Sequence, residues 1–345
     1  MTRRTFLATS TGAAIAAQAG AQSPAPAVRT SMGLTPDAFA VLRPPRTAIE
    51  FMDKARSIGA GGVQGTLASL EPAYLKSVRR HIEATGMYFE LLLPLPGEDT
   101  ATFEATVKAG KEAGAICIRT ACLSGRRYET FKTLEQWQAF VATSRAGIAR
   151  AVPIVEKHKL PLGIENHKDW TAEEMPKLLH SYSSEYVGAN IDFGNNLSLL
   201  DDPMELVEAL APFVINTHIK DMAVEEYADG FLLAEVPLGQ GFLDLKRMVS
   251  LLVSKRPNVK FSLDMITRDP LKITCLTEKY WVTFPERNGR FLAHALALVR
   301  ANKPRHPLPR VTGLDREAQL KLEMEILTEC VRYAREDLGL KPSAA

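Results

Sequence analysis

The sequence predicts an α/β fold, a single-domain (β/α)8 TIM barrel with an extra C-terminal helix. Short apolar runs typical of strands alternate with helical patterns, and polar residues recur where successive strands end. Strands that alternate with helices favour a parallel sheet, and eight such units match a TIM barrel in size and order. An open doubly wound sheet is the alternative, although no Gly-x-Gly-x-x-Gly motif opens a first helix.

The first half of the chain is expected to supply four strand–helix units. The strands are expected at 32–34, 62–67, 87–93 and 115–120, and the helices at 46–58, 71–85, 100–113 and 134–158. In the second of these helices, Leu75, Val78 and Ile82 recur at spacings of three and four residues, and Gly86 ends the pattern.

The second half repeats the alternation. Four further strands are expected at 160–167, 187–193, 214–221 and 259–265, with helices at 171–182, 203–211 and 245–253. Residues 266–287 are expected to form a long loop, and loops of this length are usually functional or disordered. Residues 315–338 are expected to form the extra helix.

Composition excludes several classes of partner. The 345 residues carry a net charge of +2, which predicts neither nucleic-acid binding nor attraction to an anionic membrane surface. No apolar stretch is long enough to span a bilayer, so we expect no stable membrane insertion.

The N-terminus contains Thr2-Arg-Arg-Thr-Phe-Leu7, which resembles a twin-arginine export signal. An Ala-rich stretch and a cleavage motif at 17–19 or 19–21 follow it. We therefore expect residues 1–27 to be a signal peptide and linker, and 28–345 to be the barrel. The resemblance implies passage through the twin-arginine translocation machinery and a periplasmic mature protein.

Four polar residues each end one of the last four predicted strands: Glu165, Asp192, His218 and Asp264. Side chains alternate between the faces of a strand, and this alternation places all four residues on one face. At the C-terminal rim of a barrel, three carboxylates and an imidazole would converge where active sites lie. This ligand set suits one divalent ion, Mn²⁺ or Mg²⁺ first, with Co²⁺, Fe²⁺ or Zn²⁺ as alternatives.

Four motifs carry a resemblance to a known family: Ile164-Glu-Asn-His167, Asn190-Ile-Asp-Phe-Gly194, Thr217-His-Ile-Lys-Asp221 and Pro237-Leu-Gly-Gln-Gly241. Together they resemble the xylose isomerase-like TIM-barrel superfamily, in its sugar isomerase and epimerase branch. The resemblance implies that a Glu, an Asp, a His and a second Glu bind one divalent metal. Asp264 replaces the second Glu, and Asn195 replaces a His that often contacts substrate.

The resemblance implies a divalent-metal-dependent isomerase or epimerase that acts on a sugar or keto-sugar. The metal would stabilise an enediolate, while Glu165 and Asp264 would move the proton next to the carbonyl. We expect four further side chains to bind substrate: Arg119, His167, Asn195 and Lys220. Gln64 and Glu90 would line the same pocket, and Trp281 and Phe284 would form an apolar wall.

Other functions remain open at this point. The changes at Asp264 and Asn195 favour a lyase that acts on 3-keto-glycosides by β-elimination, or a non-catalytic exported sugar-binding protein. Abasic-site endonucleases share the fold, but they use several His ligands and a basic DNA face, and this chain has 7 His and a net charge of +2. Barrels of this type often form homo-oligomers, although no stretch of the sequence identifies an interface.

Overall fold

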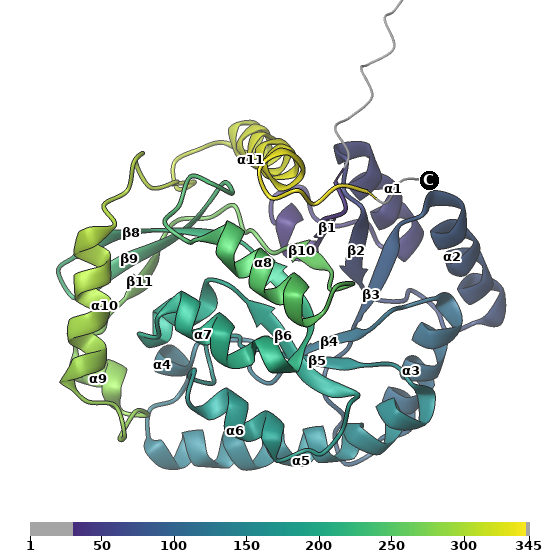
Figure 1. Ribbon diagram of the computed structural model, residues 1–345, viewed down its shortest axis with the longest axis horizontal. Helices are drawn as coiled ribbons and strands as arrows, with labels where there is room; N and C mark the ends of the chain where they lie inside the picture. The colour runs from purple at the N-terminus through teal and green to yellow at the C-terminus, as the bar shows by residue number, and fades with distance from the viewer. Residues whose placement is uncertain (1–29, 343–345) are drawn as a thin grey trace, which may run out of the picture.

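The computed structural model describes residues 30–342, so the predicted signal peptide and linker at 1–27 lie outside the described residues. Its centre is a closed barrel of eight parallel strands in the order β1-β10-β7-β6-β5-β4-β3-β2 (Figure 1). The strands are β1 (Gly33–Leu34), β2 (Gly62–Gly65), β3 (Tyr88–Leu92), β4 (Ile118–Ala121), β5 (Leu162–Glu165), β6 (Val187–Asp192), β7 (Val214–Ile219) and β10 (Phe261–Leu263). The predicted TIM barrel is confirmed.

Helices surround the barrel and bury its outer face. They are α1 (Ala48–Ile58), α2 (Pro72–Thr85), α3 (Ala101–Ala113), α5 (Leu134–His158), α6 (Glu174–His180), α7 (Pro203–Leu210) and α8 (Leu245–Lys255). The sequence marks their ends. Thr47 and Glu50 form a reciprocal capping box at the start of α1, and Gly59, with φ 102°, ends it.

Strand register aligns the polar ends of the last barrel strands. Glu165 pairs with Asn190, and His218 pairs with both Asp192 and Ser262. The alternate residues, including Ile164 and Ile191, are fully buried in the core between the strands and the helices. The predicted division of each strand into an apolar outer face and a polar inner face is therefore confirmed.

A three-stranded antiparallel sheet lies outside the barrel, with two strands from the segment between β7 and β10 and a third strand from the segment after β10. It consists of β8 (Asp221–Tyr227), β9 (Gly230–Val236) and β11 (Leu271–Ile273). The short α9 (Glu278–Trp281) follows, and α10 (Gly289–Ala301) packs against β8 and β9 (Figure 1). The prediction of a loop at 266–287 is therefore wrong in part, because apolar residues of this segment build β11 and α9 over a second core.

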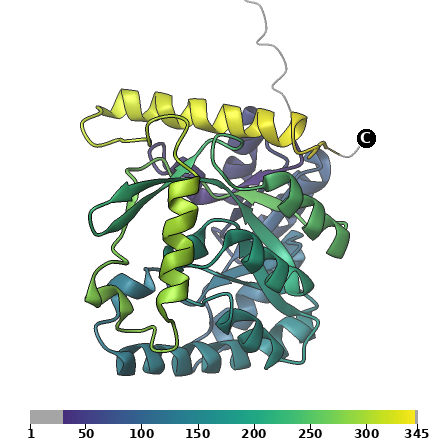
Figure 2. The same ribbon diagram turned by 60° about the vertical axis from the view of Figure 1, so that its left-hand side comes forward.

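Short helices complete the connections: η1 (Pro36–Phe39), α4 (Arg127–Thr130), η2 (Asn195–Leu199) and η3 (Ala211–Phe213). The predicted C-terminal helix is present as α11 (Arg316–Glu336), which lies across one end of the molecule in Figure 2. None of the helices within residues 30–342 has both the length and the apolar composition needed to cross a bilayer.

Candidate metal centre and active site

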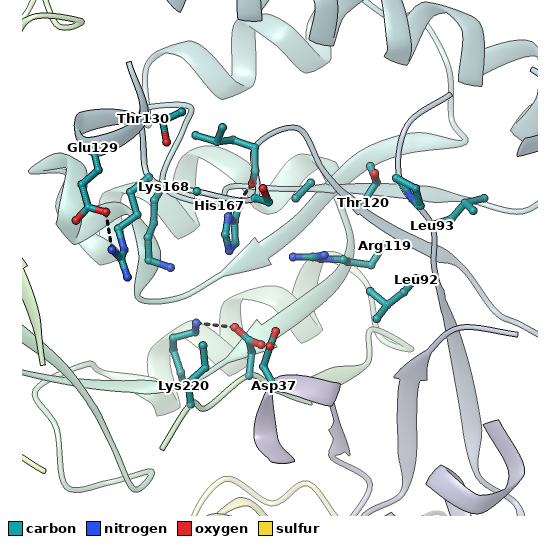
Figure 3. Close-up of a pocket in the computed structure, with 18 of the residues that line it drawn as sticks. Asp37, Leu92, Leu93, Arg119, Thr120, Glu129, Thr130, His167, Lys168 and Lys220 are labelled. Atoms are coloured by element: carbon teal, nitrogen blue, oxygen red, sulfur yellow. Dashed lines mark hydrogen bonds and ion pairs between the residues drawn. The ribbon is translucent and has the colours of Figure 1, made fainter. Parts of the chain in front are cut away.

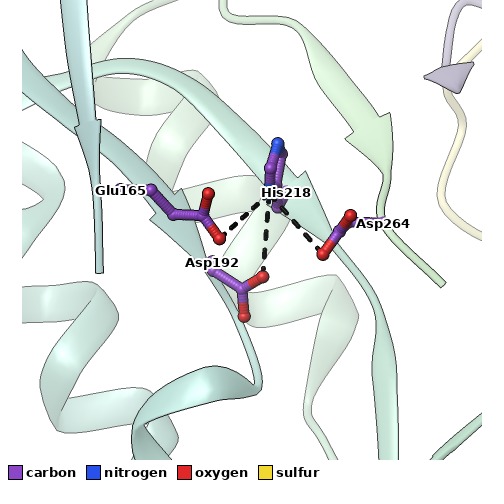
Figure 4. A group of neighbouring side chains, drawn as sticks. All are labelled: Glu165, Asp192, His218 and Asp264. Carbon is purple, nitrogen blue, oxygen red and sulfur yellow. Dashed lines mark ion pairs between the residues drawn. The ribbon is translucent and has the colours of Figure 1, made fainter. Parts of the chain in front are cut away.

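Four side chains meet at the C-terminal rim of the barrel, and each offers one ligand atom. These atoms of Glu165, Asp192, His218 and Asp264 all lie within 4.8 Å of one another, and all four residues are buried. His218 Nδ1 lies 3.3 Å from Glu165 Oε1, 3.8 Å from Asp192 Oδ2 and 3.7 Å from Asp264 Oδ2 (Figure 4). The structure thus brings together the four residues that the sequence proposed as metal ligands.

The chemistry of this group fits a divalent metal ion. Within the described chain, His218 Nδ1 and Asp192 Oδ2 are buried and have no hydrogen-bond partner. Asp192 Oδ2 does lie 2.8 Å from the Lys220 ammonium, as an ion pair. Buried polar atoms almost always have a partner, so the unpartnered His218 Nδ1 facing three carboxylates indicates a ligand position. Three carboxylates and one imidazole suit a hard cation such as Mg²⁺ or Mn²⁺.

A chain of hydrogen bonds through the barrel interior fixes the tautomer of His218. His218 Nε2 lies 2.9 Å from Gln64 Oε1, and Gln64 Nε2 donates to Glu90 Oε2 at 3.0 Å. An amide oxygen only accepts, so His218 Nε2 carries the proton and the Nδ1 lone pair faces the carboxylates. Burial also lowers the pKa of His218, which keeps the ring neutral.

Lys220 bridges two of the candidate ligands. Its Nζ lies 2.8 Å from Asp192 Oδ2 and 2.7 Å from Asp264 Oδ2, and Glu235 Oε1 is 3.8 Å away. Burial opposes the charge, but these carboxylates raise the pKa of Lys220 above its ordinary value. Burial alone would raise the pKa of Asp264, yet the Lys220 ammonium holds it well below its usual range. Thr35 Oγ1 donates to Asp264 Oδ1 at 3.0 Å, so both Asp264 oxygens have partners.

Arg119 and Asn195 hold the opposite side of the site, at Glu165. The Arg119 guanidinium pairs with Glu165 Oε2, and Asn195 Nδ2 donates to Oε1 at 3.1 Å. Burial lowers the pKa of Arg119. Asn195 Oδ1 in turn accepts a hydrogen bond from Lys168.

His167, the remaining predicted substrate residue, is half-buried at the edge of the site. Its Nδ1 lies 2.8 Å from the Leu123 carbonyl oxygen, so this nitrogen carries the proton and Nε2 can accept. Burial, reinforced by Lys168 and Arg119, lowers the pKa of His167 to about 2. A substrate role for Arg119, His167, Asn195 and Lys220 stays a prediction, although all four lie at the site.

A strongly charged cavity of 730 Å³ opens beside the candidate ligands, and Asp264 is the one of the four that lines it. Arg119, His167, Lys168, Lys220 and Asp37 line it, as Figure 3 shows. Four further charged residues contribute to the lining: Arg126, Glu129, Asp264 and Arg268.

Sequence reasoning missed several of these residues. Lys168 directly follows the Glu165–His167 motif, so its position was available as a signal, and Asp37 comes three residues after β1. Glu235, which pairs with Arg268 at 2.8 Å, belongs to the unpredicted strand β9. Its place at the site depends on a hairpin that the alternation of strands and helices does not suggest.

Two expectations about the pocket are corrected. Gln64 and Glu90 lie beneath the ligands in the barrel interior, where they bond to His218 and to each other rather than facing the cavity. Trp281 and Phe284 form no apolar wall to the cavity. Both pack around Tyr280 in the second apolar cluster, and the ring of Phe284 stacks on Tyr280 at 5.3 Å.

Asp221 explains the spacing between two of the sequence motifs. Its carboxylate accepts hydrogen bonds from the backbone N–H groups of Gly239 and Gly241, each at 2.9 Å, and of Leu243 at 3.2 Å. A Cβ on Gly241 would lie 2.1 Å from Asp221 Oδ1, so only glycine fits. Hydrogen bonds from the backbone of the glycine loop to Asp221 therefore join this loop to the His-x-Lys-Asp motif, next to Lys220 in the chain.

Comparisons with known proteins agree with this architecture. The profile of the family described as xylose isomerase-like TIM barrel matches residues 52–282. The chain is 30% identical over 199 residues to a 3-oxo-isoapionate decarboxylase from Pectobacterium atrosepticum. The match covers 56% of this chain and 68% of that protein.

Solved structures with the same fold include a D-psicose 3-epimerase in the presence of D-fructose. It has a TM-score of 0.59 and 14% identity, and the match covers 90% of this chain and 99% of the epimerase. Another structure is that of a xylose isomerase-like TIM barrel protein from Mycobacterium smegmatis in complex with magnesium. It has a TM-score of 0.55 and 16% identity, and the match covers 77% of this chain and 98% of that protein. The family profile spans well over half of the sequence, and the chain therefore belongs to the xylose isomerase-like TIM barrel family.

Proposed function

We propose that this protein is a divalent-metal-dependent enzyme that isomerises or epimerises a sugar or keto-sugar by removing a proton next to a carbonyl. The convergence of four buried ligand atoms, one of them from Asp264 in the lining of a charged cavity, carries the proposal. The similarity to a D-psicose 3-epimerase in fold, and to a 3-oxo-isoapionate decarboxylase in sequence, supports a sugar-modifying enzyme.

Glu165, Asp192, His218 and Asp264 would hold Mn²⁺ or Mg²⁺. The bound ion supplies Lewis-acid catalysis, which stabilises the negative charge that develops on the carbonyl oxygen during proton removal. Lys220 and Arg119 neutralise the carboxylates, and their N–H groups lie at the cavity where a substrate oxygen can accept a hydrogen bond.

Glu165 is the better candidate for the general base. A base works best when its pKa lies near the working pH, and the Lys220 ammonium holds the pKa of Asp264 well below its usual range. Asp264 therefore serves mainly as a ligand, which narrows the catalytic role that the sequence proposed for it. Asp37 also lines the cavity and is a second candidate to carry a proton to or from the substrate.

The fixed position of Asp264 also favours a second candidate function, that of a lyase. Elimination from a 3-keto-glycoside needs one group to remove a proton, and decarboxylation of a 3-oxo acid needs one group to return a proton. A site in which Asp264 is fixed by Lys220 and Thr35 leaves one carboxylate, Glu165, for proton transfer, which is sufficient for either reaction.

Metal content by mass spectrometry of the purified protein is the first test. We expect one divalent ion per chain, retained in His158→Ala and lost in His218→Ala and Asp192→Asn. His158 is the matched control, since it pairs with Glu104 and takes no part in the ligand group. Absence of metal from the wild type after loading with Mn²⁺ would overturn the proposal.

The reaction is tested next with the Mn²⁺-loaded protein in D₂O. An isomerase or epimerase incorporates deuterium next to the carbonyl of a ketose, which proton NMR detects. A lyase instead releases the aglycone of a 3-keto-glycoside or carbon dioxide from a 3-oxo sugar acid. Glu165→Gln should lower either rate by about 10²-fold or more, the usual effect of losing a general base.

A further inference from the structure

We propose that the cavity binds a substrate that carries an anionic group, a carboxylate or a phosphate, and that Lys168 binds this group. The inference rests on the proposed function, because it assigns a second contact to the substrate whose carbonyl lies at the metal ligands. It names a substrate class within the broader class of sugars and keto-sugars.

The charge pattern of the cavity is the first observation. Five cationic side chains line it: Arg119, Arg126, Lys168, Lys220 and Arg268. Four of the five form ion pairs: Arg119 with Glu165, Arg126 with Glu129, Lys220 with Asp192 and Asp264, and Arg268 with Glu235. Within residues 30–342, Lys168 alone among the five is in no ion pair, and its ammonium bonds only to Asn195 Oδ1. An ammonium has three donors, so two of them remain for a ligand.

Burial makes this unpaired charge significant. Lys168 is 6% exposed, and a buried charge without a partner is destabilising. Burial and then Lys220 lower the pKa of Lys168 to about 8, so the side chain remains mostly cationic at neutral pH. An anion that enters the cavity would supply the missing partner and stabilise this charge.

The position of Lys168 suits contact with a substrate at the metal ligands. Asn195 accepts from Lys168 and donates to Glu165 Oε1 at 3.1 Å, so one amide group separates the ammonium from a candidate ligand. In Figure 3 the ends of Lys168, Lys220 and Arg119 approach the middle of the same cavity. A sugar whose carbonyl oxygen lies at the ligands can therefore present a charged substituent to Lys168.

The backbone at Lys168 agrees with a role for its side chain. Its φ is 60°, in the left-handed region, which is strained for a non-glycine residue. Arg127 N–H donates to the Lys168 carbonyl at 3.0 Å, which fixes this conformation. Glycine would adopt it without strain, and lysine gains from the position only through its ammonium.

The test compares matched ligands that differ only at C6. D-fructose, D-fructuronate and D-fructose 6-phosphate, with D-tagatose and D-tagaturonate as a second set, are titrated into Mn²⁺-loaded protein by calorimetry. We expect at least one charged ligand to bind about tenfold or more tightly than its neutral parent, as a charged hydrogen bond predicts. The relative affinities of uronate and phosphate then identify which anion the site takes.

Variants assign the preference to Lys168. Lys168→Met should abolish the preference for the charged ligand, measured as the ratio of the charged and neutral affinities within the same variant, and Lys168→Arg should retain it. Arg126→Met, which removes a cation already paired with Glu129, is the control and should keep the preference. Equal preference in Lys168→Met and wild type, or no preference in the wild type, would overturn the inference.

Binding and turnover separate this inference from the proposed function. A preference that depends on Lys168, without deuterium exchange or lyase products from any ligand, would support the anion site and reject the reaction. Turnover of neutral ketoses, with charged ligands bound no better, would support the reaction and reject the anion site.

Discussion

At the scale of single residues, the site depends on the orientation of one imidazole. His218 can ligate through Nδ1 only because Gln64 Oε1 accepts from Nε2, and Gln64 is itself oriented by Glu90. Partners of this kind fix the tautomer and orientation of a ligating histidine and raise its affinity for the metal.

Replacing Gln64 tests this arrangement. In Gln64→Leu the Nε2–H of His218 loses its acceptor, so the ring can adopt the wrong tautomer or rotate. We expect metal affinity to fall about 10–100-fold, measured by Mn²⁺ titration with electron paramagnetic resonance. Ser262→Ala is the control, because Ser262 bonds to Glu90 and not to His218. An affinity within twofold of the wild type in Gln64→Leu would show that Gln64 does not orient the ligand.

The sequence correctly placed the four candidate ligands on one face because strand alternation fixes which side chains share a face. The prediction failed for Gln64, whose contact with His218 joins residues 154 positions apart across the barrel interior. Lys168 was missed for another reason. It lies just beyond the strand, where the alternation ends and its direction depends on a left-handed backbone conformation.

At the scale of elements, the β8–β9 hairpin is the main departure from a regular barrel. Asp229-Gly230, flanked by apolar residues, is a hairpin signal in the sequence, but the expectation of alternating strands and helices obscured it. The hairpin brings Glu235 to within 3.8 Å of Lys220 and so contributes to the charge balance of the site. Helix α10 covers it, and this helix also escaped prediction.

Asp221 should control the stability of this insertion. Its carboxylate accepts from four backbone N–H groups, those of Met222, Gly239, Gly241 and Leu243. Asp221→Ala leaves these donors without their acceptor, and we expect the free energy of unfolding to fall by about 2–4 kcal/mol, measured by urea denaturation. Asp221→Asn retains one acceptor oxygen, so its free energy of unfolding should lie between those of the wild type and Asp221→Ala. Full stability in Asp221→Ala would show that water replaces the carboxylate.

At the scale of the whole molecule, hydrogen bonds between the two ends of the described chain hold the first barrel strand in place. Strand β1 has only two residues, and the segments on both sides of it bond to the C-terminal region. Ser31 N–H donates to the Leu340 carbonyl at 2.9 Å, and buried Glu323 of α11 accepts from Val41 and Leu42 N–H at 2.7 and 3.0 Å. The sequence predicted α11, but its role in fixing the first strand depends on these long-range contacts.

Burying so many carboxylates should make the stability of the whole molecule depend on pH. Burial raises the pKa of four of them: Glu90, Asp169, Asp201 and Asp221. Asp169 is the clearest case. It is fully buried, its Oδ1 accepts from His167 and Trp170 N–H, and its Oδ2 has no partner among residues 30–342. Its pKa rises from 3.8 to about 7, so the folded state binds more protons than the unfolded state between these values.

The sign of the effect follows from proton linkage, and Asp169→Asn isolates it. Stability from a group whose folded pKa is raised is complete below the unfolded pKa and is lost as pH rises through the folded value. Between about pH 5.5 and pH 8, the wild type should therefore lose about 2 kcal/mol more unfolding free energy than Asp169→Asn, whose amide does not titrate. Urea denaturation in EDTA at both pH values measures this difference without a contribution from metal binding. Asp337→Asn, at an exposed position, is the control and should lose as much unfolding free energy between the two pH values as the wild type. Parallel pH profiles for the wild type and Asp169→Asn would mean that Asp169 is ionised in the folded protein, with water or a cation paired to Oδ2.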